Sequence, residues 1–245
     1  MGIFSFLKKK EQRLPADKSV TALVLASGNS SRMGGGRNKV FSLISGKPVI
    51  VYALEAFEQA LSVGKVIIVT RGDDMVEMSE IVQRYGFEKV TLILRGGDTR
   101  FESMMSGLTE LSKGTKFVAI HDGARPFITP EKINEVVLAA KSVGGAIPAV
   151  SSVDTVKRVE NGKVVSTENR DTLYFAQTPQ VFEVEKFFAA ISINKDSAYT
   201  DDSQYFESAG FGVAVVEGDR RNFKITHSSD IARAEAILTE VGTNA

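Results

Sequence analysis

The chain has 245 residues, of which 43% are hydrophobic and 24% are charged, so it is long enough for one sizeable α/β domain with its own core. Its 30 basic and 30 acidic side chains give a formal net charge of +0, which excludes a chain-wide field favouring nucleic acid or a membrane surface. Cysteine is absent, which excludes disulfides and thiolate chemistry, and no apolar run approaches the roughly 20 residues of a spanning helix. We therefore expect a cytoplasmic protein with no nucleic-acid partner, no stable membrane association and, at most, a local anion site.

The N-terminal residues 1–18 differ in composition from the chain that follows. The short apolar segment 1–7 precedes Lys8-Lys9-Lys10, which reverses the order of a secretory signal. We expect a mobile tail over residues 1–18, with weak contact to a membrane surface as the alternative, and a single domain over residues 19–245.

A glycine-rich loop, residues 27–39, directly follows the apolar run 20–26, which predicts a buried strand of a parallel sheet. Glycines and small hydroxyl residues let backbone N–H groups approach an anion closely, and Arg32, Arg37 and Lys39 add positive charge in the same short arc. This combination predicts a loop that binds a polyphosphate.

Two commoner glycine-rich patterns fit this loop poorly. A dinucleotide fingerprint would have a glycine where Ser30 stands and an acidic residue where the second strand ends in Thr70-Arg71. A P-loop would continue from Lys39 with Ser or Thr into a helix, whereas Val40-Phe41 follow here. A flexible surface loop with solvated charges is the structural alternative.

Predicted strands and helices alternate along the chain. Thr99 with Glu102 forms a capping box, and Thr129 followed by Pro130 marks another helix start. The predicted strands are 20–26, 65–70, 90–94, 117–121, 145–150 and 212–217; the predicted helices are 48–60, 74–85, 99 to about 111, one starting at 129–130, 184–193, one capped by residues 200–202, and 229–238; residues 178–180 form a predicted turn. The fold class is therefore α/β, with a Rossmann-like, mostly parallel sheet and helices on both faces.

Residues 151–172 interrupt this alternation. Two β-rich runs, 153–159 and 163–167, flank Asn161-Gly162, the pair most suited to a tight hairpin turn. Because an isolated two-stranded hairpin is marginal in water, we expect a protruding β-hairpin arm that packs on a second copy of the chain as a homodimer.

Three loops are expected to meet in space. Segments 27–39, 96–98 and 121–125 each follow a predicted strand, and open α/β sheets bind ligands beyond the carboxyl ends of their strands. Because His121 closes an apolar strand, it is expected to be a packed core residue rather than a catalyst. A nucleophile that is already anionic, such as a phosphate, needs no general base and requires only positioning and cancellation of charge.

The residues in these segments carry a resemblance to one enzyme family. In chain order the motifs are Leu-Ala-Ser-Gly-Asn-Ser-Ser-Arg-Met-Gly at 25–34 with Lys39, Gly96-Gly97-Asp98 with Ser103, His121-Asp122-Gly123-Ala124-Arg125-Pro126, Asp154-Thr155-Val156-Lys157-Arg158, Gln177-Thr178-Pro179-Gln180 and Asn222-Phe223-Lys224-Ile225-Thr226. They resemble the 2-C-methyl-D-erythritol 4-phosphate cytidylyltransferases over about residues 20–238. The first motif is shared with many nucleotidyltransferases, whereas the segment 121–126 together with the last motif is much more specific.

The resemblance implies that residues 19–245 form a nucleotidyltransferase domain. It implies transfer of a cytidylyl group from CTP to 2-C-methyl-D-erythritol 4-phosphate, with release of pyrophosphate and formation of 4-diphosphocytidyl-2-C-methyl-D-erythritol for non-mevalonate isoprenoid synthesis. It also implies Mg²⁺ as the divalent cation, held mainly by the CTP phosphates with Asp122 nearby.

The resemblance further assigns roles to individual residues. Arg32 and Lys39 match residues that stabilise the pentavalent transition state, and Arg170 and Lys224 match residues that orient the methylerythritol phosphate. The positions that match nucleotide-binding or substrate-binding residues are Ala26, Ser27, Gly28, Gly97, Asp98, Ser103, Asp122, Gly123, Arg125, Thr155 and Thr178. In such enzymes the arm reaches the neighbouring subunit, so Arg170 is expected to serve the partner's site.

The loop departs from the family's usual pattern at three positions. Asn38 stands where Pro is usual, Val40 where Gln is usual, and Ser30 where glycine is usual. The basic charges are therefore kept while the stiffening proline is lost.

Two other functions remain open from the sequence. Ribitol 5-phosphate cytidylyltransferase shares the loop, although that relative tends to have a bulkier pair at Gly123-Ala124; a nucleotide-binding module without turnover is the other alternative. Single residues also have purely structural alternatives: Asp98 and Asp202 could begin helices, Arg125 could form a surface ion pair, and Lys224 could protect a sheet edge.

Overall fold

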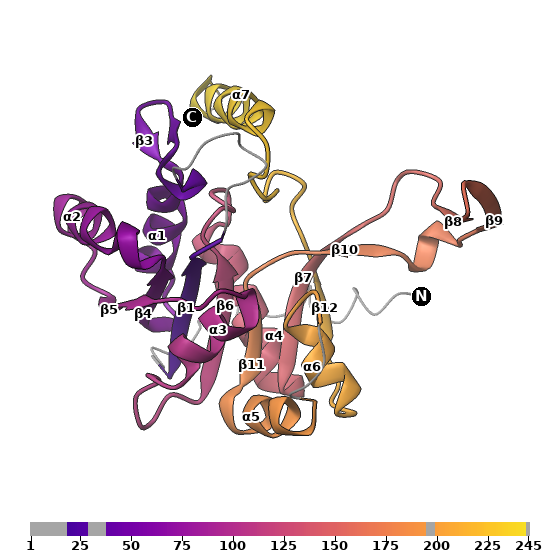
Figure 1. Ribbon diagram of the computed structural model, residues 1–245, viewed down its shortest axis with the longest axis horizontal. Coiled ribbons are helices and arrows are strands. Elements are labelled where there is room, and N and C mark those ends of the chain that lie inside the picture. Colours follow the sequence, from indigo (N-terminus) through magenta and orange to yellow (C-terminus); the bar gives the residue numbers. More distant parts are fainter. Residues whose placement is uncertain (1–18, 29–37, 195–198, 244–245) are drawn as a thin grey trace.

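The computed structural model describes residues 19–28, 38–194 and 199–243, so the expected tail at 1–18 and most of the glycine-rich loop, including Arg32, lie outside the described residues. An eight-stranded sheet forms the centre of the molecule in the order β10-β7-β11-β6-β1-β4-β5, with β12 also pairing with β7 (Figure 1). Its strands are β1 (Val20–Ala26), β4 (Val63–Thr70), β5 (Val90–Arg95), β6 (Phe117–Asp122), β7 (Gly145–Ser151), β10 (Tyr174–Ala176), β11 (Gln180–Glu183) and β12 (Ala214–Glu217).

Most neighbours in this sheet run parallel, which confirms the predicted fold class. Strand β1 lies at the centre, parallel to both β4 and β6, and every residue of β1 is buried. The exceptions are β10 and β11, which run antiparallel to the strands they join. The sequence prediction missed both, because β11 has only four residues between a proline-containing turn and a helix.

Helices cover both faces of the sheet. They are α1 (Val49–Gln59), α2 (Met75–Tyr85), α3 (Arg100–Leu108), α4 (Pro130–Val143), α5 (Val184–Ile193), α6 (Ser203–Ser208) and α7 (Ser229–Thr243). Helices α1, α2 and α4 pack on one face and α3, α5 and α6 on the other, because alternate strand residues such as Val24 and Leu25 enter the two different cores. Helix α7 packs through Ala234 against Ile44 and Val49, in a smaller cluster above the sheet (Figure 1).

Several helix boundaries follow local sequence signals. The capping box of Thr99 and Glu102 is present, and Thr129 caps α4 with Pro130 in its first turn, as predicted. Helix α3 ends at Leu108 rather than near residue 111, and short 3-10 helices, η3 (Lys39–Phe41) and η4 (Gly72–Asp74), precede α1 and α2. Within the described part of the chain, no helix is long and apolar enough to span a lipid bilayer.

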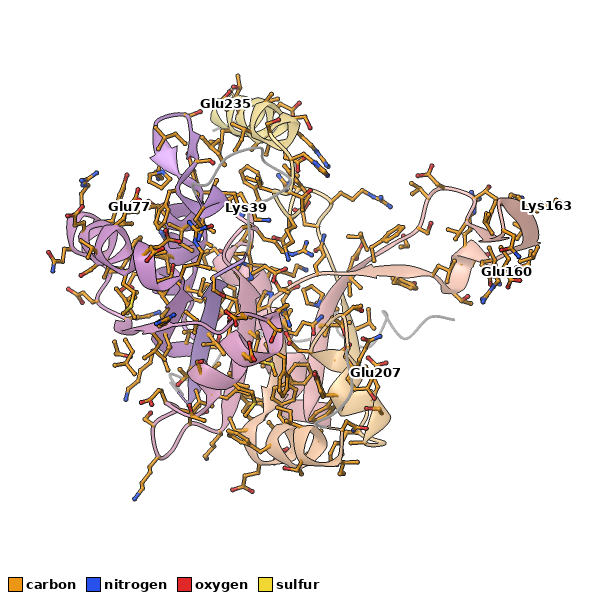
Figure 2. All side chains as sticks on the ribbon, in the orientation of Figure 1. Lys39, Glu77, Glu160, Lys163, Glu207 and Glu235 are labelled. Atoms are coloured by element: carbon orange, nitrogen blue, oxygen red, sulfur yellow. The ribbon has the colours of Figure 1, made fainter. Side chains whose placement is uncertain are left out.

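A two-stranded hairpin, β8 (Lys157–Glu160) with β9 (Lys163–Thr167), extends away from the sheet (Figure 1). Asn161 and Gly162 join the strands with φ values of 48° and 76°, the left-handed pair that a tight hairpin turn requires. The first strand begins at Lys157 rather than at residue 153, because the ladder with β9 ends where Lys157 faces Thr167. Figure 2 shows Glu160 and Lys163 at the tip of this hairpin, and every residue of both strands is exposed.

An ion pair joins the first residue of α3 to Asp202, which directly precedes α6; the Asp202 side chain is fully buried and that of Arg100 is 35% exposed. The Arg100 guanidinium donates through Nη1 to Asp202 Oδ1, and through Nη2 to Asp202 Oδ2 at 2.6 Å. Asp202 is completely buried and its side chain makes no capping hydrogen bond, so its interpretation as a helix cap alone is wrong. Burial raises the pKa of the Asp202 carboxyl, and the Arg100 guanidinium opposes that rise.

Removing the guanidinium should expose the cost of burying this carboxylate. At about pH 8, Arg100→Gln should lower the free energy of unfolding by about 3–5 kcal/mol, because Asp202 stays buried without its partner. At about pH 5 the deficit should be smaller, because an aspartate with a raised folded pKa keeps a stabilising proton at low pH and loses it as the pH rises through that pKa. Urea unfolding at both pH values measures this difference.

The variant Arg100→Gln/Asp202→Asn is the matched control, since it removes both charges. It should be more stable than Arg100→Gln at the higher pH and should show little of the added pH dependence. Equal deficits for Arg100→Gln at the two pH values would contradict an ionised, buried Asp202.

Candidate active site

A cavity of about 860 Å³ lies at the carboxyl ends of the parallel strands. Ala26 lines it at the end of β1 and Ser27 directly after, Arg71 after β4, Gly96 after β5, and Asp122 at the end of β6. This is the edge at which open α/β sheets bind ligands, and the described residues of the three loops predicted to meet line this one cavity. Figure 2 shows Lys39 near the end of β1, below α7 in this view.

The cavity gathers most of the residues singled out in the sequence. Those that line it are Ala26, Ser27, Gly28, Lys39, Gly97, Asp98, Ser103, Asp122 and Lys224. Gly123, Arg125 and Thr178 do not line the cavity, but each is hydrogen-bonded to a residue that does: Gly123 to Leu25, and Arg125 and Thr178 to Asp122. Thr155 and Arg170 belong to the exposed hairpin region and do not line the cavity of their own chain, and Arg32 lies outside the described residues.

One wall of the cavity is built from closely packed backbone. A Cβ at Gly96 would lie 2.6 Å from Ser103 Oγ, and a Cβ at Gly97 would lie 2.3 Å from the Cβ of Glu102. Ser27 Oγ donates to Ser103 Oγ at 2.8 Å, which ties the end of β1 to α3. Only glycine fits at both positions, so Ser27 and the first turn of α3 pack directly against the backbone of this wall.

The opposite wall is organised by the carboxylate of Asp122. Lys224 Nζ lies 3.0 Å and Arg125 Nε 3.3 Å from Asp122 Oδ2, and Arg100 Nε lies 3.8 Å from Oδ1. Burial by itself raises the pKa of Asp122, but the charges of Lys224, Arg100 and Arg125 outweigh it and hold the pKa well below its usual range. Asp122 therefore stays ionised and fixes these three cations around it.

Asp122 is itself held by a buried chain of hydrogen bonds. Its backbone N–H donates to Thr178 Oγ1 at 3.1 Å, and the Thr178 hydroxyl lies 3.0 Å from His121 Nδ1. His121 Nε2 donates to the carbonyl of Arg125 at 3.2 Å, so Nδ1 of the neutral ring accepts from Thr178. His121 is 0% exposed, which confirms that it is a packed core residue, and this burial lowers its pKa to about 4.

Hydrogen bonds to backbone groups hold the segment 222–226, the last of the family motifs, beside the cavity. Arg125 Nη1 donates to the carbonyl of Asn222 at 2.9 Å, and the N–H of Ile225 donates to the carbonyl of Ala124 at 2.8 Å. These bonds bring Lys224 beside Asp122, although the two residues are far apart in sequence. Lys224 therefore lines the cavity and does not protect a sheet edge.

Three arginines of the cavity were missed by reasoning from the sequence. Arg71, Arg95 and Arg100 all line it, and each lies at or just beyond the end of a strand or at the start of a helix. The rule that ligands lie at the carboxyl ends of parallel strands would have found Arg71 and Arg95. The contact between Arg100 and Asp202 spans 102 residues of sequence and leaves no local signal.

No group of three or more His, Asp or Glu side chains among residues 19–28, 38–194 and 199–243 is arranged to hold a metal ion. The cavity does contain the carboxylates of Asp73, Asp98 and Asp122 beside its cations. Mg²⁺ commonly binds through one or two carboxylates together with substrate phosphates, so this donor set fits a metal that enters with a polyphosphate.

Comparisons with known proteins identify the family of the chain. The sequence matches the family described as IspD, 2-C-methyl-D-erythritol 4-phosphate cytidylyltransferase, over residues 20–240. The protein of that name from Halalkalibacterium halodurans is 40% identical over 222 residues, which cover 90% of this chain and 97% of the relative. The corresponding protein from Bacillus mycoides is 39% identical over 220 residues, which cover 89% of this chain and 97% of the relative.

Solved structures give the same result for the fold. The crystal structure of 4-diphosphocytidyl-2C-methyl-D-erythritol synthase from Anaerococcus prevotii is similar with a TM-score of 0.81 at 30% identity, covering 91% of this chain and 97% of that one. The 2-C-methyl-D-erythritol 4-phosphate cytidylyltransferase from Thermus thermophilus is similar with a TM-score of 0.71 at 28% identity, covering 89% and 98%. Because the family match spans nearly the whole domain and the relatives are covered almost end to end, the chain belongs to the 2-C-methyl-D-erythritol 4-phosphate cytidylyltransferase family.

Proposed function

We propose that this chain transfers the cytidylyl group of CTP to 2-C-methyl-D-erythritol 4-phosphate. A phosphate oxygen of the second substrate attacks the α-phosphorus of CTP, a new P–O bond forms, and the P–O bond to pyrophosphate breaks. The product is 4-diphosphocytidyl-2-C-methyl-D-erythritol. The single observation that best supports this reaction is the position of Lys39 and Lys224 on one cavity whose other wall is the glycine backbone of residues 96–97.

The charges of the cavity suit this chemistry. Lys39, Arg71, Arg95, Arg100 and Lys224 line one space with three aspartates, so the cavity has an excess of positive side chains within the described residues. Such cations stabilise the negative charge that develops on the phosphorus under attack, and they also orient the two phosphate groups. Because the attacking phosphate is already anionic, the neutral, buried His121 has no proton to remove.

We propose Mg²⁺ as the cofactor, bound mainly by the triphosphate with Asp98 or Asp122 within the same cavity. When bound, the ion would neutralise charge on the phosphate oxygens. We also propose a cytoplasmic location, which agrees with a sequence that has no cysteine to be oxidised.

Ribitol 5-phosphate is the alternative second substrate. A Cβ at Gly123 would lie 2.7 Å from Ile50 Cδ1 and 3.2 Å from the carbonyl oxygen of Leu25, so the loop after β6 is packed for glycine. This packing favours methylerythritol phosphate, because the ribitol enzymes tend to have a bulkier pair at Gly123-Ala124.

The exposed hairpin supports a homodimer. Val159, Val164 and Val165 of the hairpin are 55%, 61% and 51% exposed, and Phe175 of β10 is 57% exposed, so large apolar side chains of this region face solvent in the single chain. Arg170 and Thr155 lie in the same region and away from their own cavity. We propose that the hairpin packs on a second copy and that Arg170 and Thr155 serve the partner's cavity.

Release of pyrophosphate tests the proposed reaction. With CTP and Mg²⁺, methylerythritol phosphate should release pyrophosphate and ribitol 5-phosphate should release far less.

Two lysine variants test the roles of the cavity's cations. Lys39→Ala should lower kcat by roughly 10²-fold or more, because one preorganised charge at the reacting phosphorus is lost. Lys224→Ala should chiefly raise KM for the polyol phosphate. Lys65→Ala, in a half of β4 distant from the cavity, is the control and should match the wild type.

In the substrate comparison, faster release of pyrophosphate with ribitol 5-phosphate would reassign the substrate. No release with either polyol phosphate would leave a nucleotide-binding module.

Mixing two inactive variants tests the dimer. Lys39→Ala loses a group of its own cavity, whereas Arg170→Ala loses a group that we assign to the partner's cavity. After denaturation and refolding together, mixed dimers should contain one intact site, and activity should return to roughly a quarter of the wild-type value, as expected for random pairing across a two-fold axis. Sedimentation should give twice the chain mass. A monomer, or a mixture that stays inactive although it is dimeric, would count against the shared site.

A further inference from the structure

Asn38, which directly precedes Lys39, connects three segments around the cavity. Its side chain is only 1% exposed. Nδ2 donates to the carbonyl of Ala26 at 2.6 Å and to Asp74 Oδ2 at 2.8 Å, and Oδ1 accepts from the N–H of Val40 at 3.3 Å. One amide therefore joins the end of β1, the end of η4 and the first turn of η3.

The orientation of this amide is fixed by its partners. The carbonyl of Ala26 and the carboxylate of Asp74 can only accept, and the N–H of Val40 can only donate. Turning the amide over would place oxygen against oxygen twice and nitrogen against nitrogen once. Only one orientation satisfies the group, so the side chain can hold the backbone at residue 38 in a single position.

Asp74 is the anchor on the far side of this contact. It is 8% exposed, and it accepts from Arg71 Nε at 2.6 Å through Oδ2 and from Arg71 Nη2 at 3.0 Å through Oδ1. Although Asp74 stands at the start of α2, its side chain makes no capping bond to that helix. Both Arg71 and Asn38 line the cavity, so the Asp74 carboxylate bonds two residues of the cavity wall rather than the backbone of α2.

Lys39 lies between two residues that are fixed in this way. Val40 and Phe41, on its C-terminal side, are 2% and 1% exposed, and the carbonyl of Lys39 accepts from the N–H of Ser42 at 3.1 Å. Lys39 lines the cavity together with Asn38 and Val40, and it is 8% exposed. The backbone from which the Lys39 side chain projects is therefore held by Asn38 on one side and by packing on the other.

We propose that Asn38 is a positioning residue, which through Ala26 and Asp74 fixes the ammonium group of Lys39 in the cavity. Asn38 makes no contact with the reacting atoms itself. Where the family usually has a stiff proline, this chain has a buried amide that is bonded to Ala26 and to Asp74. Asp74 is the partner that Asn38 requires for this role.

A comparison of two asparagines tests this role, and its kinetic part rests on the proposed function. Asn134 accepts from the N–H and the hydroxyl of Ser62 at 3.0 and 2.7 Å, at the opposite edge of the sheet. Asn38→Ala and Asn134→Ala each remove hydrogen bonds of one amide side chain. Asn38→Ala should lower kcat by about 10-fold to 10²-fold with KM for CTP changed by less than about threefold, since small displacements of a catalytic group have effects of this size. Asn134→Ala should lower the melting temperature but leave kcat unchanged.

Chemical labelling of lysine tests the same proposal without relying on activity. Acetylation of the wild type with an N-hydroxysuccinimide ester, read by mass spectrometry, should modify Lys39 slowly because the residue is only 8% exposed. In Asn38→Ala the rate at Lys39 should rise several-fold relative to Lys65 in the same sample, and in Asn134→Ala the ratio should stay at the wild-type value. If the wild type released no pyrophosphate, the function would fail while this ratio would still decide the role of Asn38.

A charge exchange distinguishes positioning from simple loss of stability. Asn38→Asp places two carboxylates in contact and should impair kcat at least as strongly as Asn38→Ala. Asn38→Asp/Asp74→Asn restores one amide facing one carboxylate and should recover part of kcat and part of the protection of Lys39. An unchanged labelling ratio in Asn38→Ala, or equal losses of kcat in Asn38→Ala and Asn134→Ala, would overturn the proposal.

Discussion

The cavity depends on the carboxylate of Asp122 at the end of β6. Lys224, Arg125 and Arg100 stand within 3.0 to 3.8 Å of its oxygens, and without this anion the three cations would repel one another at close range. Asp122 therefore lets the fold gather positive charge before any substrate arrives. Of these cations, Arg100 and Lys224 line the cavity, so in the reaction that we propose they would face the phosphates with little reorganisation.

The sheet places this carboxylate and its partners by ordinary packing. β6 and β1 run side by side through the centre with both faces covered, so Asp122 and Ser27 emerge at the same edge. Arg100, from the start of α3, connects Asp122 to the buried Asp202 at the start of α6, and Asn38 connects β1 to Asp74. The cavity wall is thus tied to the helices of both faces, and the cations are held by buried partners rather than by flexible surface loops.

Much of this arrangement could be predicted from the sequence. The apolar run Val20–Ala26 predicted the central strand, and the rule for strand ends predicted that residues 27–39, 96–98 and 121–125 meet. Short or long-range features could not be predicted in the same way. Strand β11 is too short to show a period, Asp202 has the residue type of a helix cap although its partner lies 102 residues away, and the ladder of the hairpin starts four residues later than its β-branched residues indicate. For the loop, the sequence showed that proline is replaced by Asn38, but the bonds to Ala26 and Asp74 exist only in three dimensions.

The most direct test of the central claim is a crystal structure of the protein with CTP and Mg²⁺. The base should lie against the backbone of Gly96 and Gly97, and the α-phosphate should lie between the ammonium groups of Lys39 and Lys224, in the cavity at the carboxyl ends of β1, β5 and β6. The separate cavity of about 550 Å³ lined by Lys132, Tyr174 and Arg220 should hold no nucleotide. A triphosphate bound in that second cavity, or one that leaves Lys39 and Lys224 without a phosphate contact, would contradict cytidylyl transfer at this site.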